Sequence, residues 1–558
     1  MQRRASRWIP AALFLLIPPV HAQESRGSIT GRVADASGAV VPGVRVEVTN
    51  VATGTLIRSV TNDAGSFDVP YLLPGDYRLS VHAQGFKSVV REGIQVRVSD
   101  RLALNFALEV GDISESVSVT AEAPLLEVSS ASAGRVIGQR QAAELPVMGG
   151  NAFYLARLTS GVMATERGNG QNPFDSGSGT TTIIVNGTRS GSSEVTLDGS
   201  PNMYNNTTAF GPPQDLVQEF KINTAGYDAS QGHAAGAMIN VSIRSGTNQL
   251  HGTGYLFDSW LRARPWFLNR FLYDPSTGPI NERKILQATP GWLHMRWGGT
   301  ATGPLVLPKL YDGRNRTFWS FGYEGVKVRR ETTFTGTLPT PEEKRGDFSV
   351  LLALGGAYQI YDPATTAAAA TAGRFQRLPL TGNRIPASRL DPIAQKLLSF
   401  FPDPNSPGTA DGQQNYFRIA KDDRLWGSYL GRVDHNFSQN HRVFLRVNAN
   451  TWHQETQNMP SAANGNVNER PGYGLVLDDV YVFSPQLLLN VRYGLTYQNP
   501  STQRTSQGID LLSLGIPQKV LGEIASKNTV AGIAFPEVTI DGGTYTNLGA
   551  SGGNSAAG

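Results

Sequence analysis

The sequence has no cysteine among its 558 residues. This absence excludes disulfides, thiolate metal sites, a cysteine nucleophile and a lipidated N-terminal cysteine. It does not fix the compartment, because an exported protein can fold without disulfides. Charge is also sparse, at 17% of residues with a net charge of +4, and no basic face with interleaved aromatic residues is visible. We therefore expect no nucleic-acid partner.

The common sequence signatures of catalysis are missing as well. The chain contains no Walker A sequence, no HExxH sequence and no nucleophile elbow, and its eight histidines are dispersed. We therefore expect no enzymatic activity, no bound metal and no cofactor.

Long apolar runs are confined to the N-terminus. Three arginines within the first seven residues precede an apolar stretch, residues 8–20, and Ala22 offers a cleavage position. This pattern predicts a secretory signal peptide over residues 1–22, while the alternative of a membrane anchor would need a longer run. Beyond it no run of 18 apolar residues occurs. If the mature chain crosses a membrane, a closed β-barrel is therefore required.

Glycine, at 61 residues, and aromatic residues, at 9%, are plentiful and favour a mainly β chain. Residues 26–110 alternate at period two between closely spaced turns, which predicts a compact β-sandwich. The segment resembles the carboxypeptidase regulatory-like family in four stretches: Gly31-Arg32-Val33, Pro42-Gly43-Val44, Thr61 to Phe67 and Leu73 to Tyr77. No peptidase activity is implied, because no metal-ligand spacing lies nearby, and His82 is expected to be a surface or packed histidine.

Residues 111–129 are predicted to be a linker that contains a short β-prone segment: Ser116, Val117, Ser118, Val119 and Thr120. Such a segment can add itself as a strand to the sheet edge of a partner. It resembles the TonB box of outer-membrane receptors, which implies the periplasmic domain of TonB as a partner. The alternatives are a last strand of the sandwich or a plain linker.

Residues 130–248 combine short helical stretches with a strand-turn-strand pattern. The turns Asn186-Gly187-Thr188-Arg189 and Leu197-Asp198-Gly199-Ser200-Pro201, and the run from Val217 to Asn248, resemble the α+β plug domain of TonB-dependent receptors of the Oar-like subgroup. Many plugs of that family have Arg-Gly where this chain has Asn186-Gly187. We interpret Arg189, Asp198 and Glu219 as structural residues that pair with each other or with charges of a barrel wall, rather than as ligand contacts.

Residues 249–558 alternate apolar and polar side chains over stretches of about ten residues, as transmembrane β-strands do. In residues 487–498 the odd positions are all Leu, Val or Tyr, and the even positions include Asn490, Arg492 and Thr496. Residues 317–328 and 442–452 follow the same parity. A soluble sandwich also alternates, so the connections decide between the two.

We predict seven strands in this region, and long and short connections alternate between them. The predicted strands are 252–260, 292–303, 317–329, 425–437, 441–453, 473–484 and 486–498. Long outer loops and short periplasmic turns are typical of outer-membrane barrels. Residues 312–319, 384–392 and 432–437 resemble the same Oar-like subgroup.

The sequence thus predicts a β-sandwich, an α+β plug domain and an incomplete transmembrane antiparallel β-barrel in the outer membrane of a Gram-negative-type bacterium. The resemblance implies a TonB-dependent receptor that takes up an unidentified extracellular ligand, with outer-membrane lipid around the barrel. The alternative is an adhesive or structural surface protein. Tyr358, Tyr361, Phe375 and several arginines in the longest loop could bind sugars or anions. Seven strands cannot enclose a plug, and the tail from residue 549 is not an aromatic strand, so we expect a fragment.

Overall fold

The computed structural model describes residues 25–112, 116–120, 133–145, 152–165, 182–189, 191–204, 207–226, 235–259, 273–274, 278–279, 292–484, 487–527, 533–540 and 544–549. The predicted signal peptide, residues 1–22, lies outside these ranges. Within them, no helix has the length and apolar character needed to span a membrane.

The N-terminal sandwich, residues 25–112, consists of two facing sheets. Valines and leucines at alternate positions, such as Val46, Val48, Leu79 and Val81, point inward and are fully buried. Strands β4-β1-β7 form one sheet, to which β8 is added, and β3-β2-β5-β6 form the core of the other. The strands are β1 (Gly27–Asp35), β2 (Arg45–Asn50), β3 (Leu56–Val60), β4 (Ser66–Leu72), β5 (Gly75–His82), β6 (Ser88–Val96), β7 (Arg101–Ala103) and β8 (Phe106–Leu108).

The β-prone segment of the linker extends the second of these sheets. It forms β9 (Ser116–Thr120), which pairs in parallel with β6 from Ser88↔Ser116 to Glu92↔Thr120. The segment is therefore an edge strand of the sandwich. This arrangement agrees with one of the alternatives drawn from the sequence, in which the segment is the last strand of the sandwich.

The plug-like domain, which comprises the described residues between 133 and 245, is built around a five-stranded sheet of order β10-β17-β18-β13-β14. Its core includes Ile137, Phe153, Phe220 and Val241, all buried. The elements are β10 (Ala133–Gly138), α2 (Gln139–Glu144), η2 (Ala152–Leu158), β11 (Val162–Thr165), β12 (Thr182–Val185), β13 (Glu194–Leu197), β14 (Ser200–Pro201), β15 (Met203–Tyr204), β16 (Thr207–Thr208), η3 (Gln214–Leu216), β17 (Val217–Ala225) and β18 (Met238–Ile243).

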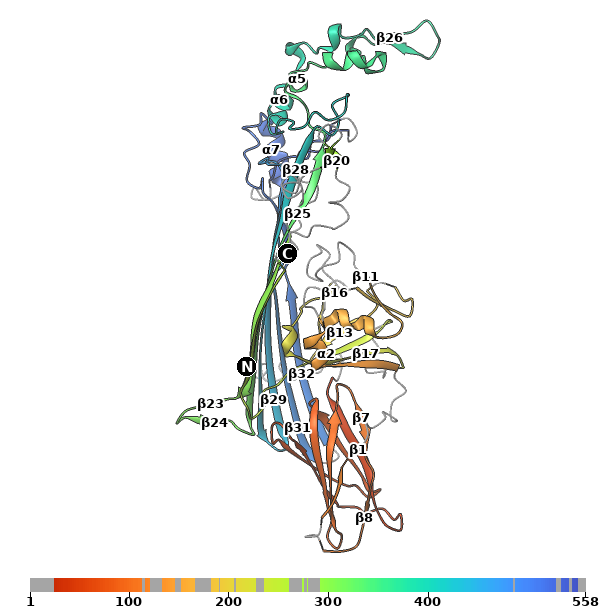
Figure 1. Cartoon of the computed structure of the whole chain (residues 1–558), viewed down its shortest axis with the longest axis vertical. Helices are drawn as coiled ribbons and strands as arrows, with labels where there is room; N and C mark the ends of the chain where they lie inside the picture. Colours follow the sequence, from red (N-terminus) through yellow and green to blue (C-terminus); the bar gives the residue numbers. More distant parts are fainter. Residues whose placement is uncertain are drawn as a thin grey trace, which may run out of the picture.

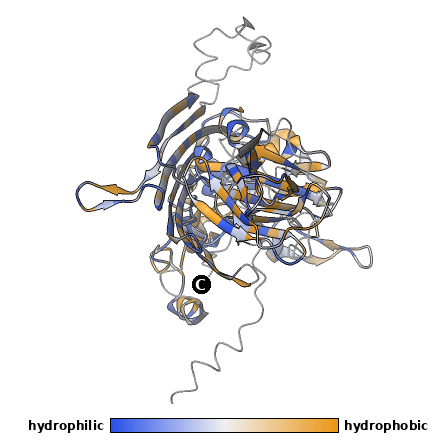
Figure 2. Cartoon of the chain, turned by 90° about the horizontal axis from the view of Figure 1, so that it is seen from below, coloured by the Kyte–Doolittle hydropathy of each residue, from blue (hydrophilic) through white to orange (hydrophobic). Residues whose placement is uncertain are grey.

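A large antiparallel sheet of nine strands follows and curves around the plug-like domain (Figures 1 and 2). Its strands are β19 (His251–Ser259), β22 (Trp292–Pro304), β25 (Thr317–Gly336), β28 (Tyr416–Ser438), β29 (His441–Thr456), β30 (Asn466–Glu469), β31 (Gly472–Ser484), β32 (Leu487–Gln498) and β33 (Ser501–Arg504). Seven of them coincide with the predicted strands. The short β30 and β33 were not predicted.

Strands β25 and β28 are longer than predicted, at 20 and 23 residues. They remain paired to each other from Thr317↔His435 to Gly336↔Tyr416. Asp423, in the added part of β28, pairs at 2.7 Å with Arg329, the last residue of the strand predicted for β25. Such residues interrupt the apolar alternation, so the pattern alone ends these strands too early.

The parity read from the sequence matches the two faces of the large sheet. The odd residues of β32, from Leu487 to Tyr497, are exposed on its outer face. In β28 and β29, Ser428, Arg432 and Arg446 are buried on the opposite face, toward the plug-like domain. An apolar outer face and a polar inner face suit a sheet with lipid on one side and a polar interior on the other.

The long connections of the large sheet gather at one end, opposite the sandwich (Figure 1). There a separate apolar core forms, which includes Leu338, Phe401, Met459 and Phe535. Helices α5 (Pro341–Lys344), α6 (Pro392–Leu398) and α7 (Gln518–Lys527) lie at this end. The hairpin of β23 (Val306–Leu307) and β24 (Tyr311–Asp312) lies at the other end.

Candidate functional site between the plug-like domain and the large sheet

The predicted turn at residues 197–199 sits at the contact with the large sheet. Asp198 has a φ of +50° and Gly199 a φ of +75°, so two successive left-handed residues close a tight hairpin between β13 and β14. Asp198 Oδ1 accepts a hydrogen bond from the Ile243 N–H at 2.9 Å. This bond fixes the carboxylate at the surface of the plug-like domain.

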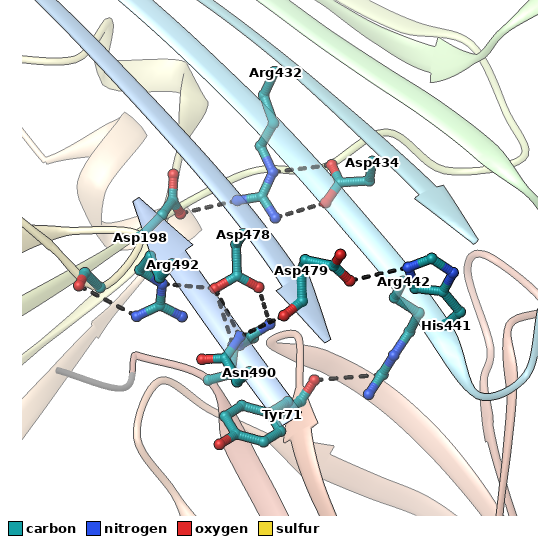
Figure 3. A network of polar contacts seen from close by, with 12 residues as sticks. Tyr71, Asp198, Arg432, Asp434, His441, Arg442, Asp478, Asp479, Asn490 and Arg492 are labelled. Carbon is teal, nitrogen blue, oxygen red and sulfur yellow. Dashed lines mark hydrogen bonds and ion pairs between the residues drawn. The ribbon is translucent and has the colours of Figure 1, made fainter. Parts of the chain in front are cut away.

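The Asp198 carboxylate contacts two arginines of the large sheet, of which Figure 3 labels Arg432. Arg432 Nη1, from β28, lies 2.9 Å from Asp198 Oδ1, and Arg446 Nη1, from β29, lies 3.2 Å from Asp198 Oδ2. Each of the three side chains is at most 4% exposed. Arg432 also donates to both carboxylate oxygens of Asp434, at 2.9 and 2.7 Å.

A second charged group adjoins the same turn. Arg492 of β32 donates to the Gly199 carbonyl at 3.2 Å and to Asp478 of β31 at 2.7 Å. Asp478 also pairs at 2.8 Å with Arg26, which belongs to the sandwich. The plug-like domain, the large sheet and the sandwich therefore meet in one buried network of charges. Figure 3 labels its members Asp198, Arg432, Asp434, Asp478 and Arg492.

This network carries more cations than anions. Four arginines (Arg26, Arg432, Arg446 and Arg492) face three aspartates (Asp198, Asp434 and Asp478). Arg446 Nε is buried without a hydrogen-bond partner among the described residues. Removing one charge from such a buried pair costs about 3–5 kcal/mol, because the partner charge stays desolvated. The carboxylate of Asp198 is therefore an energetically sensitive point of the contact.

The rest of the contact is also mainly polar. Four short hydrogen bonds cross it: Ser428 to the Gly211 carbonyl at 2.8 Å, Thr496 to the Pro201 carbonyl at 3.0 Å, Ser245 to Asp434 at 2.8 Å and Thr253 to Asp215 at 2.7 Å. Leu430 is the large-sheet residue that joins the apolar core of the plug-like domain, as far as the described residues go. A domain held by separate polar contacts can be released contact by contact, since water can replace each one.

The other predicted site residues have different surroundings. Asn186 and Gly187 form a second left-handed turn, and Asn186 donates to the Thr224 carbonyl within the plug-like domain at 3.2 Å. Leu197 is fully buried in the core. Arg189 is exposed, and no ion pair links it to Asp198 or to another described residue. Two kinds of pairing were expected for these turns. Asp198 makes the second kind, with charges of the large sheet, and no pair between Asp198 and Arg189 is seen.

Glu219, expected to face a wall charge or another turn, faces the sandwich. Its carboxylate accepts the backbone N–H of Val98. Burial raises the pKa of Glu219 to about 7, a rise that nearby Asp100 also favours and that the Val98 N–H, Arg97 and Lys221 oppose. Sequence reasoning missed this contact, because nothing in the local pattern shows which domain covers β17.

No group of three or more metal-ligating side chains of the kind that binds a metal ion occurs among the residues the structure describes. The charged groups described above link the plug-like domain to the large sheet.

Comparison with known proteins identifies the class of the chain. Residues 242–557 match the outer membrane beta barrel domain family, and residues 28–109 match the carboxypeptidase regulatory-like domain. The first match covers more than half of the chain, so the protein belongs to the outer membrane beta barrel family. It is an outer-membrane protein with an N-terminal regulatory-like sandwich, as the sequence predicted.

The chain is similar to the TonB-dependent transporter Oar of Myxococcus xanthus, with 29% identity over 302 residues. That match covers 50% of this chain and 26% of Oar, so the chain matches about a quarter of that protein's length. Among solved structures, it is similar to the outer membrane transporter YddB from Escherichia coli, with 10% identity, coverage of 66% of this chain and 39% of YddB, and a TM-score of 0.39. A mutant of the ferric enterobactin receptor PfeA from Pseudomonas aeruginosa gives 10% identity, coverage of 67% and 41%, and a TM-score of 0.33.

Proposed function

We propose that the protein is a TonB-dependent outer-membrane transporter in which the plug-like domain closes a β-barrel. The observation that carries the proposal is the buried contact of Asp198 with Arg432 and Arg446 on the inner face of the large sheet. A folded domain seated by charges against the polar face of a membrane sheet blocks the path along that face. The similarity to Oar supports transport rather than passive diffusion.

Energy coupling is assigned to residues 116–120. In this proposal the periplasmic domain of TonB pairs with the segment, pulls it, and displaces part of the plug-like domain with energy from the proton gradient. The segment is an extended edge strand, and such a strand can pair with a partner through its free edge.

We further propose a neutral, hydroxyl-rich ligand such as a carbohydrate. A cleft at the end away from the sandwich is lined, among the residues that the structure describes, by amides and hydroxyls and by no charged side chain; it includes Thr456, Asn458, Asn466 and Asn547. Phe334 and Met459 add apolar surface. Amides can both donate to and accept from hydroxyl groups, whereas a charged ligand would be left without a counter-charge.

A second candidate function is adhesion at the cell surface without transport. The long connection between β25 and β28 exposes several apolar side chains, including Val350, Phe375 and Leu378. Exposed apolar side chains of this kind are typical of surfaces that bind another protein or a surface.

Disulfide capture of TonB separates the two functions. Because the chain has no cysteine, Ser118→Cys introduces a single thiol into the coupling segment, and Ser37→Cys places one on an exposed turn of the same sandwich. Each variant is combined with single-cysteine variants of the TonB periplasmic domain, and the yield of the disulfide between the two proteins is measured. If the protein is a TonB-dependent transporter, we expect the yield for Ser118→Cys to be well above that for Ser37→Cys. Equal yields at the two positions would contradict energy coupling through residues 116–120 and would favour adhesion without transport.

A further inference from the structure

The sandwich contacts the plug-like domain through the turn of residues 98–100, which follows β6. Every residue of the turn makes a polar contact: the Val98 N–H donates to Glu219, the Ser99 hydroxyl accepts from Asn240 at 3.2 Å, and Asp100 pairs with Lys221 at 3.3 Å. Ser99 has a φ of +54°, which a residue with a side chain seldom adopts. Contacts on both sides hold this conformation in place.

The surface beneath the turn is polar but buried. Glu219 and Lys221 share one face of β17, and Asn240 and Ser242 lie beside them on β18, in the register Lys221↔Asn240 and Glu219↔Ser242. All four side chains are buried. Burying ionisable groups carries a desolvation penalty, so this contact separates more readily than an apolar one of equal area.

The same sandwich is also anchored to the large sheet. Arg26 pairs with Asp478 at 2.8 Å, Arg58 donates to Gln439 at 2.8 Å, and Asn436 donates to Thr55 at 3.1 Å. In Figure 1 the sandwich lies below the plug-like domain, at the end opposite the long connections. A domain that is fixed to the large sheet and pressed against β17 and β18 resists movement of the plug-like domain toward its own side.

The coupling segment lies on this sandwich. Strand β9 pairs along β6, and β6 ends at Val96, two residues before the contact turn begins. A pull on β9 therefore acts first on the strand that leads into residues 98–100.

From these contacts we infer that the regulatory-like sandwich is a lock: it holds the plug-like domain closed through residues 98–100, and this turn must leave β17 and β18 before the plug-like domain can move. The inference rests on the transport proposed above, because a lock has a purpose only if the plug-like domain moves. Pulling on β9 opens the lock.

A single buried thiol reports whether the lock is open. Ser242→Cys replaces a hydroxyl by a thiol of similar size under the turn, and no other cysteine is present to react. In cells that express the full protein with TonB, we measure the rate at which a membrane-impermeant thiol reagent, admitted to the periplasm, modifies this position. A protonophore removes the proton gradient in a parallel sample.

Charge reversal then tests the turn from both sides. In the Ser242→Cys background with the protonophore, Asp100→Lys sets a cation against Lys221, and Lys221→Asp sets an anion against Asp100. Each is expected to raise the labelling rate by about tenfold or more, since a buried ion pair is lost. The double variant Asp100→Lys/Lys221→Asp restores the pair and returns slow labelling. Asp63→Lys, a charge reversal on an exposed turn of the same sandwich, is the matched control and leaves the rate unchanged.

The outcomes separate the lock from transport. If both single variants are labelled as slowly as the parent while present in the outer membrane at equal amounts, the lock is wrong. If the double variant stays fast, the specific pairing of Asp100 with Lys221 is not what closes it, and the lock is likewise rejected. A third outcome is that the single variants are labelled fast in the presence of the protonophore, while the parent is labelled equally slowly with and without the proton gradient. In that case the lock is supported and the transport proposal fails.

Discussion

At the residue scale, the contact between the plug-like domain and the large sheet centres on Asp198, a short carboxylate in a left-handed turn. The turn was visible in the sequence because Asp-Gly is a favoured pair for two successive left-handed residues. Its partners Arg432 and Arg446 lie more than 230 residues away in the chain. No local pattern marks them among the other arginines of the barrel strands, so the sequence predicted the turn and only a generic charged partner.

Replacing Asp198 tests how strongly the plug-like domain is held against the large sheet. We expect Asp198→Asn to destabilise the docked domain by about 3–5 kcal/mol, because Arg432 and Arg446 stay buried without their counter-charge. Hydrogen exchange of β13 and β18 in outer-membrane vesicles measures the effect. Asp63→Asn, on an exposed turn of the sandwich, is the control, and equal exchange in the two variants would refute the role given to Asp198.

The Glu219 carboxyl makes the contact of the sandwich pH-dependent. Its pKa is about 7 when buried, against 4.5 for a free glutamate. A raised pKa means that the docked state binds the proton more tightly, so docking is strongest below about 4.5 and weakens as the pH rises to about 7. We expect the Ser242→Cys thiol, normalised to Ser37→Cys, to be labelled faster at pH 8 than at pH 5.5. Glu219→Gln should remove this difference, and a difference that survives it points to another group.

At the scale of the element, each strand of the large sheet is defined by its two faces. Leu489 on β32 is about half exposed on the apolar face, whereas its neighbour Asn490 donates to Asp478 at 3.1 Å on the polar face. Side chains of a strand alternate whatever the tertiary context, so the sequence located seven of these strands. It missed β30 and β33, which are too short to show a period.

A charge on the outer face of β32 tests whether lipid surrounds it. Leu489→Arg is expected to destabilise the sheet by about 2–4 kcal/mol at mid-membrane depth, since the guanidinium would face hydrocarbon. The measurement is the fraction of full-length protein that assembles into the outer membrane. Leu489→Phe keeps the face apolar and should assemble normally. Normal assembly of the arginine variant would indicate that water, not lipid, covers this face.

At the scale of the whole molecule, the sandwich, the plug-like domain and the large sheet contact one another mainly through polar groups. The sandwich has its own apolar core, the core of the plug-like domain also takes in Leu430 of the large sheet, and a third core lies at the long connections of that sheet. Apolar packing stabilises the inside of these bodies, whereas hydrogen bonds and ion pairs make the contacts described above between them. This division suits a protein in which one body moves past another.

Unfolding in urea should show the same division. We expect the plug-like domain to lose protection from hydrogen exchange at a lower urea concentration than the large sheet, because its contacts with that sheet are mainly polar and exchangeable with water. Peptides from β17 and β18 report the first transition, and peptides from β28 and β29 the second. A single coincident transition for all four strands would show that the bodies unfold as one.

The sequence by itself determined the order of the domains, the faces of the barrel strands and the tight turn at Asp198, because periodicity and turn chemistry are local properties of the chain. Only the tertiary structure decided which arginines form ion pairs with Asp198. It also decided that the sandwich, and not the large sheet, covers Glu219 and Lys221. These contacts join residues more than a hundred positions apart. Charged side chains carry no local mark of their partner, so only the packed fold selects it.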